Sequence, residues 1–214
     1  IPPEQVTSAM LADGVWHVTG GSHYSVIVEF DDFLAVVEAP LGEARSMAVL
    51  AEAKRLAPNK PVRYVLTTHH HFDHISGLRT YAAEGATIVT HASNVSYFEQ
   101  TLVAPATVVP DMQAQKMGAP MLNGVSDMYV ITDDTQTIEI YATDGDTHTN
   151  EYTLVYLPDH GLLVEADAYS PGPPEAPVPA VPPPNAVKLY EEIERLNLNV
   201  TTIVPIHGRG AVSI

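Results

Sequence analysis

The chain has 214 residues, 45% of them hydrophobic, which is enough to bury a substantial core, and we expect a single domain over residues 1–214. Its net charge of −16 at pH 7 argues against a nucleic acid as partner, and no run of about 18 apolar residues is present to span a membrane. The absence of cysteine excludes disulfides, thiolate metal sites and a cysteine nucleophile.

The first third of the sequence predicts a meander of three antiparallel strands. β-branched and aromatic residues dominate the three runs, and Gly20-Gly21 and Asp31-Asp32 separate them as turns. We expect the strands at 15–19, 24–30 and 33–38, then a helix at 43–56 and a short apolar strand at 62–66.

The rest of the sequence alternates between segments with the hydrophobic spacing of helices and segments with that of strands. Helices are expected at 78–83, 92–100 and 186–196, and strands at 86–90, 128–131, 137–141, 153–157, 162–165 and 200–206. This order predicts an α/β fold in which two sheets are sandwiched between helices.

Two segments have no regular pattern. The methionine-rich stretch Met112–Met128, within the weakly patterned residues 101–127, is expected to be a mobile loop or cover. Its methionines serve either as an adaptable lid over substrate or as gap-filling core residues. Pro171–Pro184 holds eight prolines in fourteen residues and is therefore expected to be a stiff, extended surface loop. We favour a role as a pocket wall over that of an inert connection.

A cluster of histidines follows the apolar strand at 62–66 directly. Four of the ten histidines and one aspartate lie between His69 and His74. In an extended loop, His69, His71 and Asp73 would point to one side, while His70 and Phe72 would point to the other. Such a cluster after a buried strand indicates a metal site, and its make-up suggests two adjacent ions that each need further ligands.

Three later residues can supply those ligands. His148 lies in a turn between two predicted strands, Asp167 follows the strand at 162–165, and His207 follows the last strand. Each is at a strand end beside small or turn residues, from where a side chain reaches a shared cleft.

The ordered set resembles the metallo-β-lactamase superfamily of hydrolases. The signature H-x-H-x-D-H is complete in His69-His70-His71-Phe72-Asp73-His74, and the later landmarks follow in order from Val15 to Gly208. The resemblance implies an αββα sandwich with one metal on His69, His71 and His148. A second metal is implied on Asp73, His74 and His207, with Asp167 bridging the two.

The details favour one group of branches of that family. True β-lactamases generally lack the bridging aspartate, and one branch uses a cysteine that this chain does not contain. The set of seven ligands is similar to that of glyoxalase II, lactonases and related esterases or phosphodiesterases. Diiron reductases usually have a glutamate in the place of His71, and nucleic-acid-processing members carry basic surfaces that are missing here.

This resemblance implies a dinuclear hydrolase acting on a small ester, thioester, lactone or amide. Two divalent ions, zinc first and iron or manganese as alternatives, would share a hydroxide that attacks the substrate, and Asp73 would orient it and pass its proton on. A phosphodiesterase, a β-lactamase and a non-catalytic metal-binding accessory module are the alternatives.

The other candidates carry weaker expectations. His70 is expected to face away from the cleft. The other isolated histidines, His17, His23, His91 and His160, are expected at the surface or the edge of the core. Of these, His23 is the one that would border the cleft. Tyr169 either contacts substrate or packs. The start at Ile1 leaves a removed upstream region open and, with the proline content, favours a periplasmic or secreted location over a cytoplasmic one. The oligomeric state stays open.

Overall fold

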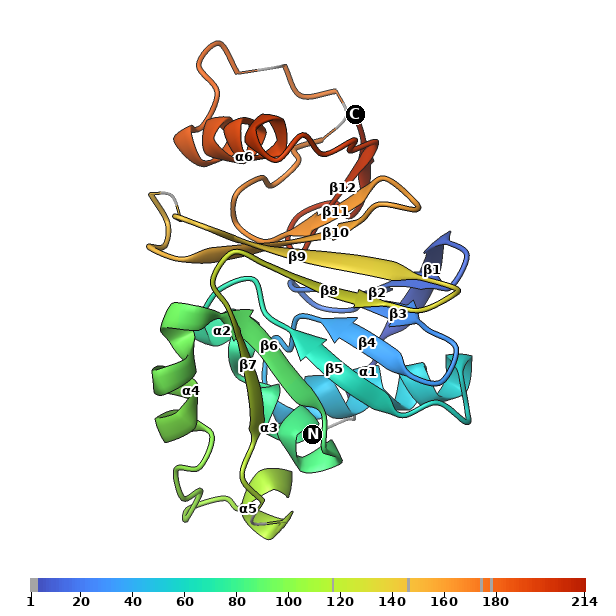
Figure 1. The fold of residues 1–214 in the computed structure, drawn as a ribbon, viewed down its shortest axis with the longest axis vertical. Coiled ribbons are helices and arrows are strands. Elements are labelled where there is room, and N and C mark those ends of the chain that lie inside the picture. Colours follow the sequence, from blue (N-terminus) through green and yellow to red (C-terminus); the bar gives the residue numbers. More distant parts are fainter. Residues whose placement is uncertain (1–3, 117, 146, 174, 178) are drawn as a thin grey trace.

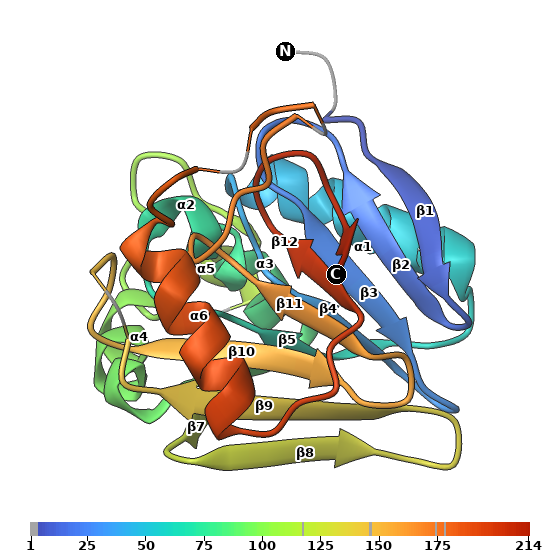
Figure 2. The same ribbon diagram turned by 90° about the horizontal axis from the view of Figure 1, so that it is seen from above.

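A computed structural model of the chain describes residues 4–116, 118–145, 147–173, 175–177 and 179–214. In these residues the strands form two sheets that pack face to face (Figures 1 and 2). The first sheet contains, in spatial order, β1 (Thr7–Ala12), β2 (Val15–Thr19), β3 (Ser25–Glu29), β4 (Leu34–Val37), β5 (Val62–Leu66), β6 (Thr87–His91) and β7 (Met121–Val125). The second contains β13 (Val212–Ser213), β12 (Thr202–Pro205), β11 (Leu162–Glu165), β10 (Tyr152–Leu157), β9 (Thr137–Thr143) and β8 (Met128–Thr132).

Helices cover the outer faces of both sheets. Figure 1 shows α6 on the outer face of the second sheet and the longer helices of the first half of the chain on the far side of the first sheet. The helices are α1 (Glu43–Leu56), α2 (Phe72–Ile75), α3 (Leu78–Glu84), α4 (Val95–Thr101), α5 (Met112–Lys116) and α6 (Pro184–Arg195), with a 3-10 turn, η1 (Ala92–Asn94). The predicted fold class, an αββα sandwich of two mixed sheets, is confirmed.

Strand alternation assigns the side chains to three apolar layers. In β3, Val26 and Val28 point into the layer between the sheets, whereas Ile27 points toward the helices on the first sheet. Across the inter-sheet layer, Ile138 and Ile140 of β9 complete the packing. A third layer joins the second sheet to α6. All five of these side chains are at most 1% exposed, so the two sheets are held together by a dry core.

The structure adds elements in the segments where the sequence pattern was weak. Strand β1 precedes the predicted meander, and α5 and β7 lie within Met112–Met128. Helix α5 packs against α3 on the outer side of the first sheet, where Asp111 accepts hydrogen bonds from Arg79. The described part of this segment, which excludes Met117, therefore contains a helix and a strand where an irregular loop was predicted. Met121 and Met128 are each 51% exposed, so they do not fill the core either.

No helix among the described residues is long and apolar enough to cross a membrane.

Candidate metal centre

The side chains predicted to bind metal lie at one end of the sandwich, where several strands finish. Strands β4, β5 and β6 run parallel, as do β11 and β12, so the carboxyl ends of each set meet at one edge of its sheet. The backbone N–H of Thr153 in β10 donates to the carbonyl of Thr68 over 2.7 Å, which joins the second sheet to the loop after β5. The loops after β5, β9, β11 and β12 carry five of the seven predicted residues, and helix α2 carries Asp73 and His74.

One group of donors comes from the loop after β5 and from the second sheet. It contains His69, His71, His148 and Asp167, whose donor atoms all lie within 4.8 Å of one another. Nδ1 of His71 is 2.9 Å from Nε2 of His148, and Oδ2 of Asp167 is 3.0 Å from that same nitrogen. The structure thus places together the three histidines predicted to hold the first metal.

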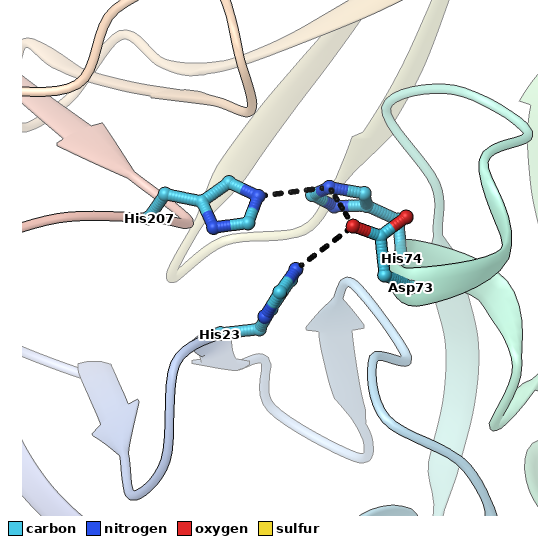
Figure 3. A group of neighbouring side chains, drawn as sticks. All are labelled: His23, Asp73, His74 and His207. Atoms are coloured by element: carbon cyan, nitrogen blue, oxygen red, sulfur yellow. Dashed lines mark hydrogen bonds and ion pairs between the residues drawn. The ribbon is translucent and has the colours of Figure 1, made fainter.

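A second group lies beside the first and is drawn in Figure 3. It contains Asp73, His74 and His207, as predicted, together with His23. Nε2 of His207 is 3.0 Å from Nε2 of His74, which in turn is 4.0 Å from Oδ2 of Asp73. All seven predicted side chains therefore fall in two adjacent groups.

Asp167 contacts both groups. Its Oδ1 lies 2.8 Å from Nε2 of His207, and its Oδ2 lies 3.0 Å from Nε2 of His74 as well as from that of His148. The backbone of Asp167 has φ 65°, a left-handed conformation that directs its carboxylate into the centre. Oε2 of the buried Glu165 accepts the N–H groups of Ala168 and Tyr169, which stabilises this turn.

The donor set fits divalent metal ions. Nε2 of His69 is buried and lies 3.3 Å from Asp167 without a well-aligned hydrogen bond among the described residues. Nitrogen atoms of different histidines also face one another at 2.9 and 3.0 Å, a separation that donors to a common ion can have. Imidazole and carboxylate donors in this arrangement suit zinc, iron, manganese or cobalt.

Burial and neighbouring charges set the protonation of these groups. Burial, together with His69 and His148, lowers the pKa of His71. Burial would raise the pKa of Asp167, but the neighbouring imidazoles of His207, His69 and His74 hold it well below its usual range. Burial would likewise lower the pKa of His74, but hydrogen bonds to Asp167 and Glu38 outweigh it and raise that pKa to about 10. A metal ion binds the neutral imidazole, so metal binding and protonation of His74 compete.

Glu38 supports His74 from below. Its Oε1 accepts the backbone N–H of Thr68 over 2.6 Å, and its Oε2 lies 2.7 Å from Nδ1 of His74. The hydrogen bond fixes the His74 tautomer, with Nε2 turned toward Asp167. Sequence reasoning missed Glu38; the available signal is a carboxylate at the end of the otherwise apolar run Leu34–Val37.

The predicted direction of the Asp73 side chain was wrong. Its side chain was expected to share a side with His69 and His71 in an extended loop, but helix α2 begins at Phe72. Asp73 therefore turns away from His71 and faces His23. His70 does face away, as predicted, and pairs with Glu151.

The proline-rich loop lines a cavity next to Asp167. This cavity has a volume of about 980 Å³, and its walls include Tyr169, Pro171, Pro183 and Arg209. Most described residues of Pro171–Pro184, a range from which Pro174 and Val178 are excluded, line this cavity, in agreement with the expected role of the loop as a pocket wall.

Comparison with known proteins identifies the family. The model of the metallo-β-lactamase superfamily matches residues 18–207. The chain belongs to the metallo-β-lactamase superfamily. It is by family a metal-dependent hydrolase, as the histidine signature predicted. No curated protein matched the chain.

Solved metallo-β-lactamases share the fold. The enzyme from Pontibacter korlensis is 18% identical with a TM-score of 0.72, and the match covers 98% of this chain and 94% of that one. FIM-1 from Pseudomonas aeruginosa, in its mono-zinc form, is 20% identical with a TM-score of 0.66, and the match covers 99% and 92%. The enzyme from Hirschia baltica is 18% identical with a TM-score of 0.67, covering 98% and 93%. At these identities the likeness shows the fold alone.

Proposed function

We propose that this member of the superfamily is a dinuclear metal-dependent hydrolase of a small ester, thioester, lactone or amide. The observation that supports it best is the position of Asp167, whose two oxygens contact imidazoles of both donor groups. A carboxylate placed in this way can bridge two ions, and FIM-1, with its mono-zinc form, supports zinc as the metal to test first.

Two sets of side chains would hold the two ions. His69, His71 and His148 would hold one ion, while Asp73, His74 and His207 would hold the other. When bound, the two ions would supply Lewis acidity and lower the pKa of a water molecule toward neutrality.

Asp73 is assigned the role of accepting the proton of the nucleophile and passing it on. Its side chain is 53% exposed, unlike the fully buried His74, so it can meet both substrate and solvent. Burial would raise the pKa of Asp73, but His74, a backbone hydrogen bond and His23 together lower it, so the carboxylate is ionised near neutral pH and is in the form that accepts a proton.

The cavity beside Asp167 supports a small substrate. Prolines and alanines dominate its walls, so it suits an apolar group, and its rigid prolines lose little entropy on binding. Arg209 contributes a cation at the same cavity, where one guanidinium nitrogen donates to the carbonyl of Gly172 over 3.1 Å.

β-Lactamase activity is the second candidate, because the solved relatives named above are metallo-β-lactamases. An amide in a strained ring lies within the proposed substrate class, so the two candidates share the metal centre and differ in what the cavity accepts.

Metal analysis tests the centre. The purified protein should contain close to two equivalents of divalent metal, and a protein that binds none after reconstitution with zinc contradicts the proposal. Asp73→Ala should abolish hydrolysis while the far-ultraviolet circular dichroism stays unchanged. Asp134→Ala, at an exposed position outside the centre, is the matched control and should retain activity.

A substrate panel separates the candidates. The zinc-loaded protein is assayed with chromogenic esters, thioesters, lactones, phosphodiesters and a cephalosporin. Turnover of the acyl substrates supports the proposal, and turnover of the cephalosporin alone assigns a β-lactamase. Turnover of phosphodiesters alone favours the phosphodiesterase. Turnover of none of these substrates by a protein that binds two ions favours the accessory module.

A further inference from the structure

His23 occupies a place in the centre that the family's signature does not assign. It precedes β3, after the Gly20-Gly21 turn, and is only 7% exposed. Its ring centroid lies 3.9 Å from that of His207 and 5.1 Å from that of His74 (Figure 3). Nε2 of His23 points at Oδ2 of Asp73, 3.2 Å away.

These distances suit donors to a common ion. Two ligands bonded at about 2.1 Å to one metal lie no more than about 4.2 Å apart. The three distances measured along the group are 3.2 Å from His23 to Asp73, 4.0 Å from Asp73 to His74 and 3.0 Å from His74 to His207. Each falls within that limit, and all four donor atoms of the group lie within 4.8 Å of one another.

The ring of His23 is held in the orientation that a ligand needs. Its Nδ1 lies 2.8 Å from Oγ of Ser22, and this contact leaves Nε2 for the centre. A second contact of this kind, from Glu38, orients His74. Metal-binding histidines commonly have such a partner on the other ring nitrogen.

A buried arginine fixes the loop that carries His23. Arg45 of α1 is fully buried, and Nη2 donates to the carbonyl of His23 over 3.1 Å. Nη1 of Arg45 donates to the carbonyl of Gly20. A buried guanidinium that binds the carbonyls at both ends of the turn makes this loop a built part of the centre.

We propose that His23 is a fourth protein ligand of the second metal, in addition to Asp73, His74 and His207. This inference rests on the dinuclear centre proposed above. With the bridging Asp167, the second ion has five protein donors, whereas the first has four. The second position therefore suits metals that accept five or six ligands, and it holds its ion more tightly than a site of three side chains and a bridge.

Metal titration tests the assignment. The full chain is stripped with a chelator and titrated with Zn²⁺ against a chromophoric competitor, for the wild type, His23→Gln and the control His91→Gln. His91 lies outside both donor groups and contacts Ser93. The wild type and His91→Gln should bind two ions with equal affinities. In His23→Gln the affinity for one ion should fall at least about 10-fold, because loss of even an outer partner costs about 10–100-fold.

Cobalt spectroscopy gives a second measurement that does not depend on activity. With Co²⁺, the wild type should show the weak visible absorption typical of five or six donors at one site, and His23→Gln should show stronger absorption as that number falls. If His23→Gln does not fold, the wild type still decides: its Co²⁺-shifted proton spectrum should contain a ring N–H signal assigned to His23.

The outcomes separate this inference from the proposed function. Two ions bound by the wild type, with unchanged affinity and an unchanged cobalt spectrum in His23→Gln, overturn the role of His23 and leave the dinuclear hydrolase standing. Absence of a shifted His23 signal in the wild type does the same. A wild type that binds fewer than two ions overturns both.

Discussion

Nδ1 of His74 lies 2.7 Å from Oε2 of Glu38, and both side chains are completely shielded from solvent. The pair connects the end of β4 to the second donor group. Because Glu38 also accepts the N–H of Thr68, one carboxylate positions both a metal-binding imidazole and the loop that begins the histidine signature.

Glu38→Gln tests this support. The amide keeps the shape but loses the charge that stabilises His74, so the metal-free protein should lose about 1–3 kcal/mol of unfolding free energy. Its affinity for the second Zn²⁺ should fall about 10–100-fold. Urea unfolding and the competition titration measure the two effects. Glu84→Gln, at an exposed position, should change stability by less than about 0.5 kcal/mol. Equal stability of the two variants would contradict the role of Glu38.

Asp167→Asn separates charge from backbone conformation. Asparagine tolerates the left-handed φ of 65°, so the fold should be retained. Without a carboxylate between the two groups, the reconstituted protein should hold fewer than two zinc ions. Metal analysis checks this, with the exposed Asp159→Asn as the control. Two tightly bound ions in Asp167→Asn would show that the carboxylate does not bridge.

The acid dependence of stability should report Glu52. Hydrogen bonds from Arg55 and Ser8 outweigh burial and lower the pKa of Glu52 from 4.5 to about 2. Because the folded pKa is the lower one, this stabilisation is fully present above pH 4.5 and is lost as the pH falls through about 2. Arg55 is 63% exposed, so screening limits the contribution to about 1 kcal/mol.

Glu52→Gln isolates that contribution. Urea unfolding of the wild type and the variant should differ by the full amount near pH 5, and the difference should shrink toward pH 2. A difference that is independent of pH would mean that the carboxylate does not stabilise the fold through its charge.

Gly77→Ala should destabilise the packing of α3. A Cβ at Gly77 would lie 1.9 Å from Oγ of Ser46 and 2.9 Å from the carbonyl oxygen of Ala39, and this backbone atom cannot rotate away. The expected loss is about 1–3 kcal/mol in thermal or urea unfolding. Gly118→Ala is the control, because nothing lies within 4 Å of the added atom. A loss of similar size in both variants would contradict the steric origin of the effect.

The sandwich could be predicted where side chains alternate or form apolar runs. Val26, Ile27 and Val28 divide between two apolar layers, and such strands were located within one or two residues. Strand β1 has no such pattern because it is an edge strand with no buried residue, and its Met10 is 64% exposed. Strand β7 contains Asn123 and Gly124, which rarely favour strands, and its pairing with β6 decides its structure.

The candidate site, too, could be predicted from the sequence only in part. The signature from His69 to His74 is local, and His148, Asp167 and His207 stand at recognisable strand ends, so all seven could be named in advance. His23 was expected only to border the cleft, because nothing near it in sequence marks it as a ligand. Its position depends on Arg45, which binds the loop only after α1 has packed.

The two donor groups draw on both halves of the sandwich. Residues up to His74 belong to the first sheet and its loops, whereas His148, Asp167 and His207 belong to the second. Neither half alone contains a complete set of donors, so a cation coordinated there would cross-link the two sheets. Expressed as separate fragments, the two halves of the chain would each lack the metal affinity that their reassembly restores.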